Sequence, residues 1–285
     1  MITTATRTHG SDASMIRRRW WLEVLYILAF YLIYSTIRNQ FGSGGNFKVG
    51  SGRSLDNAIA IIDVEKAMGL FFEEAVQRPV IGWDWYLQFW NIFYGSLHFA
   101  VTIFAMVFLY IRFPLRYRCY RNIILSTTAF ALIGFVTFPL MPPRLLNAGE
   151  PYGAELSQYD FVDSLAKVGG LWSFDSGTME AISNQWAAMP SLHISWAMWC
   201  TIALYPVLQS GWSRFAIAAY PFLTLYAIVV TANHYWIDAV GGAIILVLGW
   251  HVGTRISKWI SARPVTPADD SEPQAPAISD RNGAH

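Results

Sequence analysis

Apolar residues gather in long stretches that are separated by polar connections. A helix that crosses a bilayer needs about 20 mainly apolar residues. The pattern predicts six transmembrane helices, which lie at residues 20–37, 85–111, 120–140, 190–208, 214–232 and 236–257. We therefore expect an all-α, polytopic membrane domain over residues 20–262, with a site built from side chains of several helices.

Polar residues dominate both ends of the chain. Residues 1–19 and 263–285 contain too few large apolar side chains to form a core, and we expect both segments to be disordered and cytoplasmic. In "SLDNAIAIIDVEKAMGLFFEEAVQRPV", acids alternate with apolar residues at helical spacing, which is typical of an amphipathic helix on the outer membrane surface. The connection 145–189 is long enough to predict that it covers the site and helps to select the substrate.

Basic residues predict the orientation in the membrane, because Lys and Arg concentrate in cytoplasmic loops. If all six segments cross the membrane, all the basic clusters fall on the same side of it. The basic residues lie at 17–19, 112–121, 214 and 255–263. Both termini are then cytoplasmic, and the long connections 38–84 and 141–189 face outward. The first segment lacks a small-x-small cleavage pattern and reads as a retained signal anchor, which suits a bacterial plasma membrane.

The amino-acid composition also indicates a membrane protein, and it limits the classes of partner that the protein can bind. Of 285 residues, 54% are hydrophobic and only 14% are charged, against about 25% charged in soluble proteins. The net charge is +1, and no basic run is interleaved with aromatic residues, so we expect no nucleic-acid partner. Cys119 and Cys200 stand far apart, and their spacing indicates neither a metal site nor a disulfide framework.

Two ionisable residues share one face at the predicted outer end of the last helix. In "ANHYWIDAVGG", His234 and Asp238 are four residues apart, which places both side chains on the same side of a helix. A carboxylate that accepts a hydrogen bond from one ring nitrogen leaves the other nitrogen a better base or nucleophile. The alternative is an ion pair that only stabilises the start of the helix.

Two further motifs reach the same predicted depth. In "MPSLH", Pro190 favours a helix start, so the N–H groups of Ser191, Leu192 and His193 would face outer water as an anion site. His193 would then be placed to protonate a leaving alkoxide, or it would only be an interfacial histidine wetted at its tip. Arg144 in "FPLMPPRLL" has a planar fork that suits phosphate, although arginines at helix ends also anchor lipid headgroups.

The order Arg, Pro-Ser-x-His and His-x-x-x-Asp resembles the type-2 phosphatidic acid phosphatase superfamily of membrane lipid phosphatases and phosphotransferases. The motifs "PPRLL", "PSLH" and "HYWID" are similar to those of its inositol phosphorylceramide synthase branch. Over residues 85–250 the resemblance implies a six-helix fold with its site at the membrane surface. It also implies that His234 attacks phosphorus to form a phosphohistidine, Asp238 orients it, His193 protonates the leaving group and Arg144 binds phosphate oxygens, without a metal or other cofactor.

The sequence departs from the classical pattern at three positions. Thr137 and Ile228 stand where classical members carry a Lys and an Arg that bind phosphate, and Leu192 stands in place of Gly. Lys167 in the outer connection is one candidate replacement, although a solvated surface lysine is the simpler reading.

Other polar residues near the motifs are candidate substrate contacts. Tyr94 and His98 lie four apart on an early helix, as in a similar Tyr-x-x-x-His pattern of the branch. The alternative for His98 is a buried histidine bonded to a neighbouring helix. Tyr235 and Asn233 flank the predicted nucleophile and either bind phosphate oxygens or line the interface, and Ser191 belongs to the predicted anion site.

The sequence thus predicts an integral membrane lipid phosphatase that acts on a lipid phosphate at the outer leaflet. Hydrolysis is placed first because water is always available at an outward site. The first alternative is a phosphotransferase that moves a phospho-headgroup between lipids or to inositol. A second alternative is a transporter with His98, His193 and His234 as a proton relay, or a lipid-phosphate binder without turnover.

Overall fold

The computed structural model describes residues 20–41, 47–149, 152–171 and 185–262. Over these residues the backbone is helical or irregular, and its one isolated β-bridge joins Leu140 to Ala187. The all-α fold class is therefore confirmed. Residues 1–19 and 263–285, which we expected to be disordered, lie outside the described residues.

The described helices follow one another along the whole chain. They are α2 (Trp20–Phe41), α3 (Phe47–Ala67), α4 (Glu73–Gln77), the 3₁₀-helix η1 (Arg78–Val80), α5 (Asp84–Ile92), the π-helix η2 (Phe93–Leu97), α6 (His98–Arg112), α7 (Pro114–Thr137), α8 (Pro143–Leu146), α9 (Ser164–Val168), α11 (Leu192–Leu204), α12 (Gly211–Val230) and α13 (Trp236–Ser261).

Five of the six predicted apolar segments overlap one helix each, and the segment 85–111 covers α5, η2 and α6 in succession. Four helical stretches are long and apolar enough to cross a membrane, at residues 84–112, 114–137, 211–230 and 236–261. The apolar part of α2, Trp20–Ile33, and the whole of α11 are shorter. The molecule is therefore an integral membrane protein by the length and composition of its helices, whereas the crossing of α2 and α11 stays a prediction.

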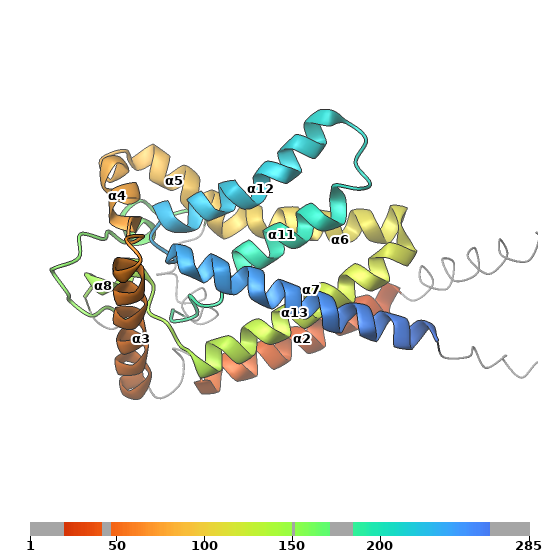
Figure 1. The fold of residues 1–285 in the computed structure, drawn as a ribbon, viewed down its shortest axis with the longest axis horizontal. Helices are drawn as coiled ribbons and strands as arrows, with labels where there is room; N and C mark the ends of the chain where they lie inside the picture. The colour runs from red at the N-terminus through yellow and green to blue at the C-terminus, as the bar shows by residue number, and fades with distance from the viewer. Residues whose placement is uncertain (1–19, 42–46, 150–151, 172–184, 263–285) are drawn as a thin grey trace, which may run out of the picture.

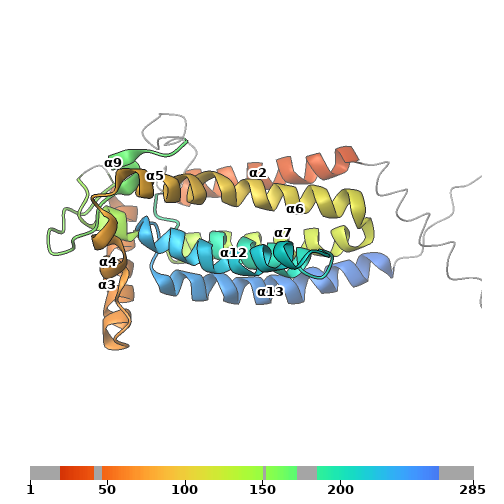
Figure 2. The same ribbon diagram turned by 90° about the horizontal axis from the view of Figure 1, so that it is seen from above.

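The long helices run side by side, and α3 lies across one end of this bundle (Figures 1 and 2). The same end carries α4, α8 and α9. The beginning of α2 and the end of α13 lie together at the opposite end (Figure 1). Because α3 begins at Phe47, before the predicted amphipathic stretch at Ser54, that helix is longer than expected. Its place on a membrane surface remains a prediction.

Helices α7 and α13 pack with their backbones in close approach. A Cβ added at Gly249 would lie 2.1 Å from Oγ1 and 2.7 Å from Cα of Thr127, and one at Gly253 would lie 2.6 Å from Cα of Ile123. Small residues four apart allow this approach, which is a common device between membrane helices. The contact fixes α13, whose first turn carries Asp238 of the predicted catalytic pair, against the helix that leads to Arg144.

We predict that Gly249→Ala destabilises the protein by about 1–3 kcal/mol, because the added methyl group must push α13 away from Thr127. The measurement is the midpoint of thermal unfolding of the purified protein in detergent. Gly211→Ala is the matched control, since a Cβ there meets no atom within 4 Å. Equal midpoints for the two variants would contradict the close packing.

Candidate active site

A tight turn between α12 and α13 places His234. The N–H groups of Asn233 and His234 both donate to the carbonyl of Ile228, at 3.0 and 3.1 Å. Ala232 adopts a positive φ of 53°, a region that is costly for a residue with a Cβ. Its carbonyl accepts the backbone N–H of Arg144 at 2.8 Å, so the turn and the arginine motif are built as one unit.

His234 and Asp238 form a buried hydrogen-bonded pair. The His234 Nδ1 and Asp238 Oδ2 atoms are 3.1 Å apart, and the same carboxylate oxygen accepts the N–H of Tyr235 at 3.1 Å. Because the carboxylate can only accept, Nδ1 carries the hydrogen and Nε2 is left with its lone pair. The arrangement gives His234 the geometry of an oriented nucleophile or base.

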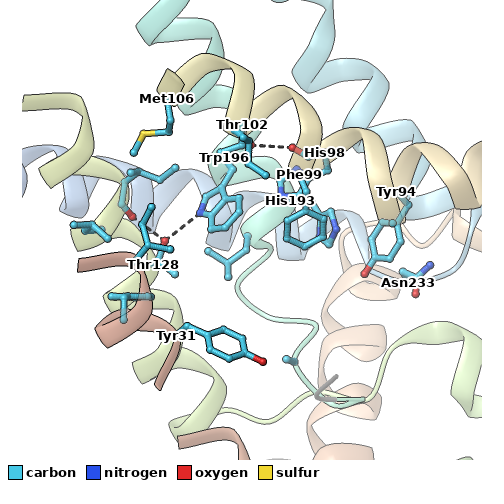
Figure 3. A pocket seen from close by; sticks show the side chains of 18 of the residues that line it. Tyr31, Tyr94, His98, Phe99, Thr102, Met106, Thr128, His193, Trp196 and Asn233 are labelled. Atoms are coloured by element: carbon cyan, nitrogen blue, oxygen red, sulfur yellow. Dashed lines mark hydrogen bonds between the residues drawn. The ribbon is translucent and has the colours of Figure 1, made fainter. Parts of the chain in front are cut away.

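His193 lies in a cluster of rings that includes His234, and Figure 3 shows His193 together with Tyr94 and His98 of this cluster. Its ring centroid is 5.6 Å from that of His234, 4.1 Å from Tyr94 and 4.4 Å from His98. His98 in turn stacks on Trp196 at 5.2 Å. Tyr94 comes from the π-helix η2, a local widening of the helix that often occurs at functional sites.

His98 is buried, and its ring lines the same cavity as His193. Among the described residues, no group forms a hydrogen bond with its Nδ1. The alternative of a histidine satisfied by a neighbouring helix is therefore not supported at this nitrogen. A substrate oxygen that enters the cavity would supply the missing partner, because buried polar atoms are rarely left unpaired.

Arg144 is held by acceptors from three parts of the chain. Its Nε donates to Oδ1 of Asn233 at 3.0 Å, and its two Nη atoms donate to Asp163 and Gln185. Asp163 also caps α9 by accepting the N–H groups of Leu165 and Ala166. The connection 145–189 thus contributes Asp163 and Gln185 as acceptors, which places these parts of it against the site. Sequence reasoning missed both residues because neither belongs to a motif.

These side chains meet at one end of a cavity of about 860 Å³ that Tyr94, His98, Arg144, His193 and His234 help to line. Over the described ranges, Arg144 is the one Lys or Arg in its wall. An anion that entered this end would therefore meet one guanidinium and the histidines.

The positions that depart from the classical pattern do not add a cation to this wall. Lys167 forms an ion pair with Asp84 at 3.1 Å and does not line the cavity. Thr137 is exposed at the end of α7, and Ile228 is packed inside the protein. The structure brings no replacement from these positions to Arg144.

The expectation that the Ser191 N–H is unsatisfied is wrong. Helix α11 begins at Leu192, after Pro190, and the Ser191 N–H donates to the carbonyl of Asp238 at 3.0 Å. The Ser191 hydroxyl accepts the N–H of Ile194 at 3.5 Å. Ser191 therefore joins α11 to α13 and is not part of the cavity wall.

Tyr235 also lies behind the cavity wall. Its hydroxyl donates to the carbonyl of Met141 at 3.2 Å, and the side chain is completely buried. Burial, and to a smaller extent the charge of Asp238, raise the pKa of this hydroxyl well above its ordinary value. The hydroxyl therefore keeps its proton and can donate it in a hydrogen bond. The geometry gives Tyr235 a supporting contact and places Asn233 in the cavity wall.

Two buried glutamates that sequence reasoning missed hold the start of α13. Oε1 of Glu73 accepts the N–H of Trp236 at 3.1 Å, and Oε1 of Glu65 accepts the N–H of Ile237 at 3.3 Å. Burial, and then the charge of Glu73, raise the pKa of Glu65 from 4.5 to about 9. Glu65 therefore carries a proton at neutral pH. The acids were visible in the amphipathic stretch, but nothing local linked them to α13.

We predict that stability falls as pH rises from about 4.5 to about 9, in part because of Glu65. In this range the Glu65 side chain keeps its proton in the folded state but loses it in the unfolded chain. The free energy of unfolding therefore decreases as the pH rises. Glu73 and Asp238 are the neighbouring acids that oppose its ionisation. Glu65→Gln, which mimics the protonated form, should flatten the pH dependence and gain relative stability toward pH 9.

The measurement is thermal unfolding in detergent across this pH range. Glu74→Gln is the matched control, since Glu74 belongs to α4 like Glu73 but lies beside Arg78 at 3.9 Å. An unchanged slope for Glu65→Gln would show that Glu65 is already ionised in the folded protein.

Comparison with known proteins adds one finding. A family profile described as the PAP2 superfamily matches residues 59–252, which include the whole cluster from Glu65 to Asp238. This match supports the superfamily resemblance but not the inositol phosphorylceramide synthase branch. No curated protein and no solved structure matches the chain.

Proposed function

The chain belongs to the PAP2 superfamily, and from this premise we propose that it is a membrane lipid phosphatase that acts at the outer leaflet through a phosphohistidine. The observation that carries the proposal is the His234–Asp238 pair, which faces His193 in a cavity that also holds Arg144. These residues supply a nucleophile, an acid and a phosphate ligand at one place.

The proposed reaction has two steps. Nε2 of His234 attacks phosphorus while the bond from phosphorus to the lipid oxygen breaks, and His193 gives its proton to that oxygen. A water molecule then attacks phosphorus, His193 takes a proton from the water, and the bond from phosphorus to Nε2 breaks to release phosphate. Arg144 stabilises the charge on the phosphoryl oxygens in both steps. Asp238 stabilises the positive charge that His234 acquires.

Phosphotransfer to another hydroxyl is a second candidate that one observation favours. Arg144 is paired with Asp163, so the cavity wall has little net positive charge to offer. A phosphodiester brings one negative charge and a monoester brings up to two, which makes the diester easier to accommodate. A lipid or polyol hydroxyl would then replace water in the second step.

The geometry gives less support to a transmembrane proton relay. The rings of His98, His193 and His234 form one continuous cluster, with centroids 4.4 and 5.6 Å apart. A relay requires ionisable groups spread through the thickness of the membrane. A group of histidines at one depth is better suited to chemistry on a bound headgroup.

We predict that the purified protein releases phosphate from lipid phosphates in the presence of EDTA, since the proposed steps use side chains alone. His193→Ala should lower kcat by about 10²–10⁴-fold, the usual loss for a general acid. His234→Ala should abolish both turnover and the acid-labile phosphohistidine that radiolabelled substrate leaves on the protein. The measurements are phosphate release and label retained at mild alkaline pH but lost in acid.

His251→Ala is the control, because His251 is an exposed histidine of α13 outside the cavity wall. Full turnover by His234→Ala would overturn the proposed mechanism. Label transfer to an added polyol or lipid alcohol, with no release to water, would move the assignment to the transferase.

A further inference from the structure

An ion pair between Arg144 and Asp163 stands at the wall of the cavity, where the proposed function places the phosphate. Nη1 of Arg144 and Oδ2 of Asp163 are 2.5 Å apart, and the two side chains are 7% and 16% exposed. Arg144 lines the cavity, and so does Leu165, two residues after Asp163. Lys167, the next cationic residue of this segment, pairs instead with Asp84 at 3.1 Å. A carboxylate beside the guanidinium opposes any anion that binds there.

The backbone on both sides of Asp163 is fastened to α4 and α5 by side-chain amides. Before it, the Val162 N–H donates to Oε1 of Gln77 at 3.0 Å, and the Val162 carbonyl accepts from Nε2 of the same side chain at 2.9 Å. After it, the Ser164 hydroxyl donates to Oδ1 of Asn91 at 2.8 Å, and the Ser164 carbonyl accepts from Nδ2 at 3.0 Å. Gln77, Asn91 and Ser164 are buried, so water does not compete for these bonds.

The two carboxylate oxygens of Asp163 have separate partners. Oδ1 accepts the N–H groups of Leu165 and Ala166, each at 3.0 Å, and thereby caps α9. Oδ2 accepts from Arg144. Rotation of the carboxylate away from the guanidinium would also break the cap and leave its donors without an acceptor. Asp163 therefore stays beside Arg144 when an anion enters, and its charge acts on that anion.

The charges at this end of the cavity cancel before a substrate binds. Among the described residues, Arg144 is the one Lys or Arg in the wall, and Asp163 offsets its charge. In the proposed reaction His193 starts with one proton, and the carboxylate of Asp238, which is paired with His234, offsets that charge. A second negative charge on the phosphoryl group would find no further cation in this wall, and an unpaired charge in an apolar enclosure is costly.

We propose that Asp163 is a specificity-determining residue, which makes the site select a phosphoryl group with one negative charge over one with two. The proposal rests on the proposed function, because the phosphoryl group must lie at Arg144 to be affected by Asp163. Two kinds of substrate have this charge, a phosphodiester lipid and a lipid monophosphate that keeps one proton. A phosphomonoester loses that proton with a pKa of about 6, so the protein would accept it best in mildly acidic solution.

The first test measures the binding of two lipid analogues that are not turned over. A long-chain alkylphosphonate and the matching alkyl(methyl)phosphinate have the same tail, and neither can be hydrolysed at its carbon–phosphorus bonds. At a pH at which the phosphonate has lost both protons, they carry two negative charges and one. Wild-type protein in detergent should bind the phosphinate more tightly by calorimetry. Asp163→Asn should shift the ratio of the two dissociation constants about tenfold in favour of the phosphonate.

Asp160→Asn is the matched control, since Asp160 lies in the same segment, pairs with Arg78 at 2.8 Å and has a side chain that is 67% exposed. It should leave the ratio unchanged. Asn and Ser both cap helices, so Asp163→Asn should keep α9 in place, and Asp163→Ser provides a second uncharged cap. The thermal midpoint without ligand shows whether each variant is folded. A ratio that Asp163→Asn and Asp163→Ser leave unchanged, or that Asp160→Asn shifts equally, would overturn the proposal.

The second test distinguishes the two sources of a singly charged phosphoryl group. The kcat/KM of Asp163→Asn is divided by that of the wild type from about pH 5 to pH 8, with a lipid monophosphate and with a phosphodiester of the same tail. The titrations of His193, His234 and Asp238 affect both proteins and largely cancel in this quotient. With the monophosphate the quotient should rise about tenfold as the substrate loses its second proton. With the phosphodiester, whose charge is constant, it should not change with pH.

The substrate that is turned over then identifies the source. Turnover of the monophosphate with a rising quotient assigns the singly protonated monoester, and turnover of the phosphodiester alone assigns the diester. A constant quotient with the monophosphate would overturn the role of Asp163 and leave the proposed phosphatase in place. If neither lipid is turned over but the phosphinate preference depends on Asp163, the proposed function fails and the selection by charge stands.

Discussion

The first turn of α13 must have its backbone N–H groups satisfied inside the protein, and this constraint organises the site. A helix start leaves several donors without partners in the helix and carries a partial positive charge. Side-chain oxygens of three acidic residues accept them, from Asp238 within the turn and from Glu65 and Glu73 on α3 and α4. Helix α3, which lies across the end of the bundle, is thus tied to the start of α13, directly after His234.

Those contacts connect the site to several helices although it lies at the end of the bundle. Asp238 uses one oxygen for the Tyr235 N–H and for the His234 ring, while its carbonyl accepts the Ser191 N–H. A displacement of α13 would disturb His234 and α11 together. The glycine contact of α13 with α7 resists such a displacement along the rest of the helix.

Local geometry made part of this structure predictable. The apolar segments and the pairing of His234 with Asp238 follow from helix length and from a spacing of four residues. The partners of Arg144 and of the α13 start could not be predicted, because Asp163, Gln185, Glu65 and Glu73 lie in other segments and carry no pattern of their own. The start of α11 was also misplaced, because Pro190 precedes the N-cap Ser191 where it was expected to open the helix.

The small number of cations in the cavity follows from the same surroundings. A second Lys or Arg beside Arg144 would need its own buried partner, because an unpaired charge in an apolar enclosure is very costly. One guanidinium held by Asp163, Gln185 and Asn233 avoids that cost. In the function proposed above, a phosphate would meet donors that are already oriented in a medium of low polarity, where each interaction is stronger than in water. Orientation and exclusion of water can therefore compensate for the cations that classical members carry.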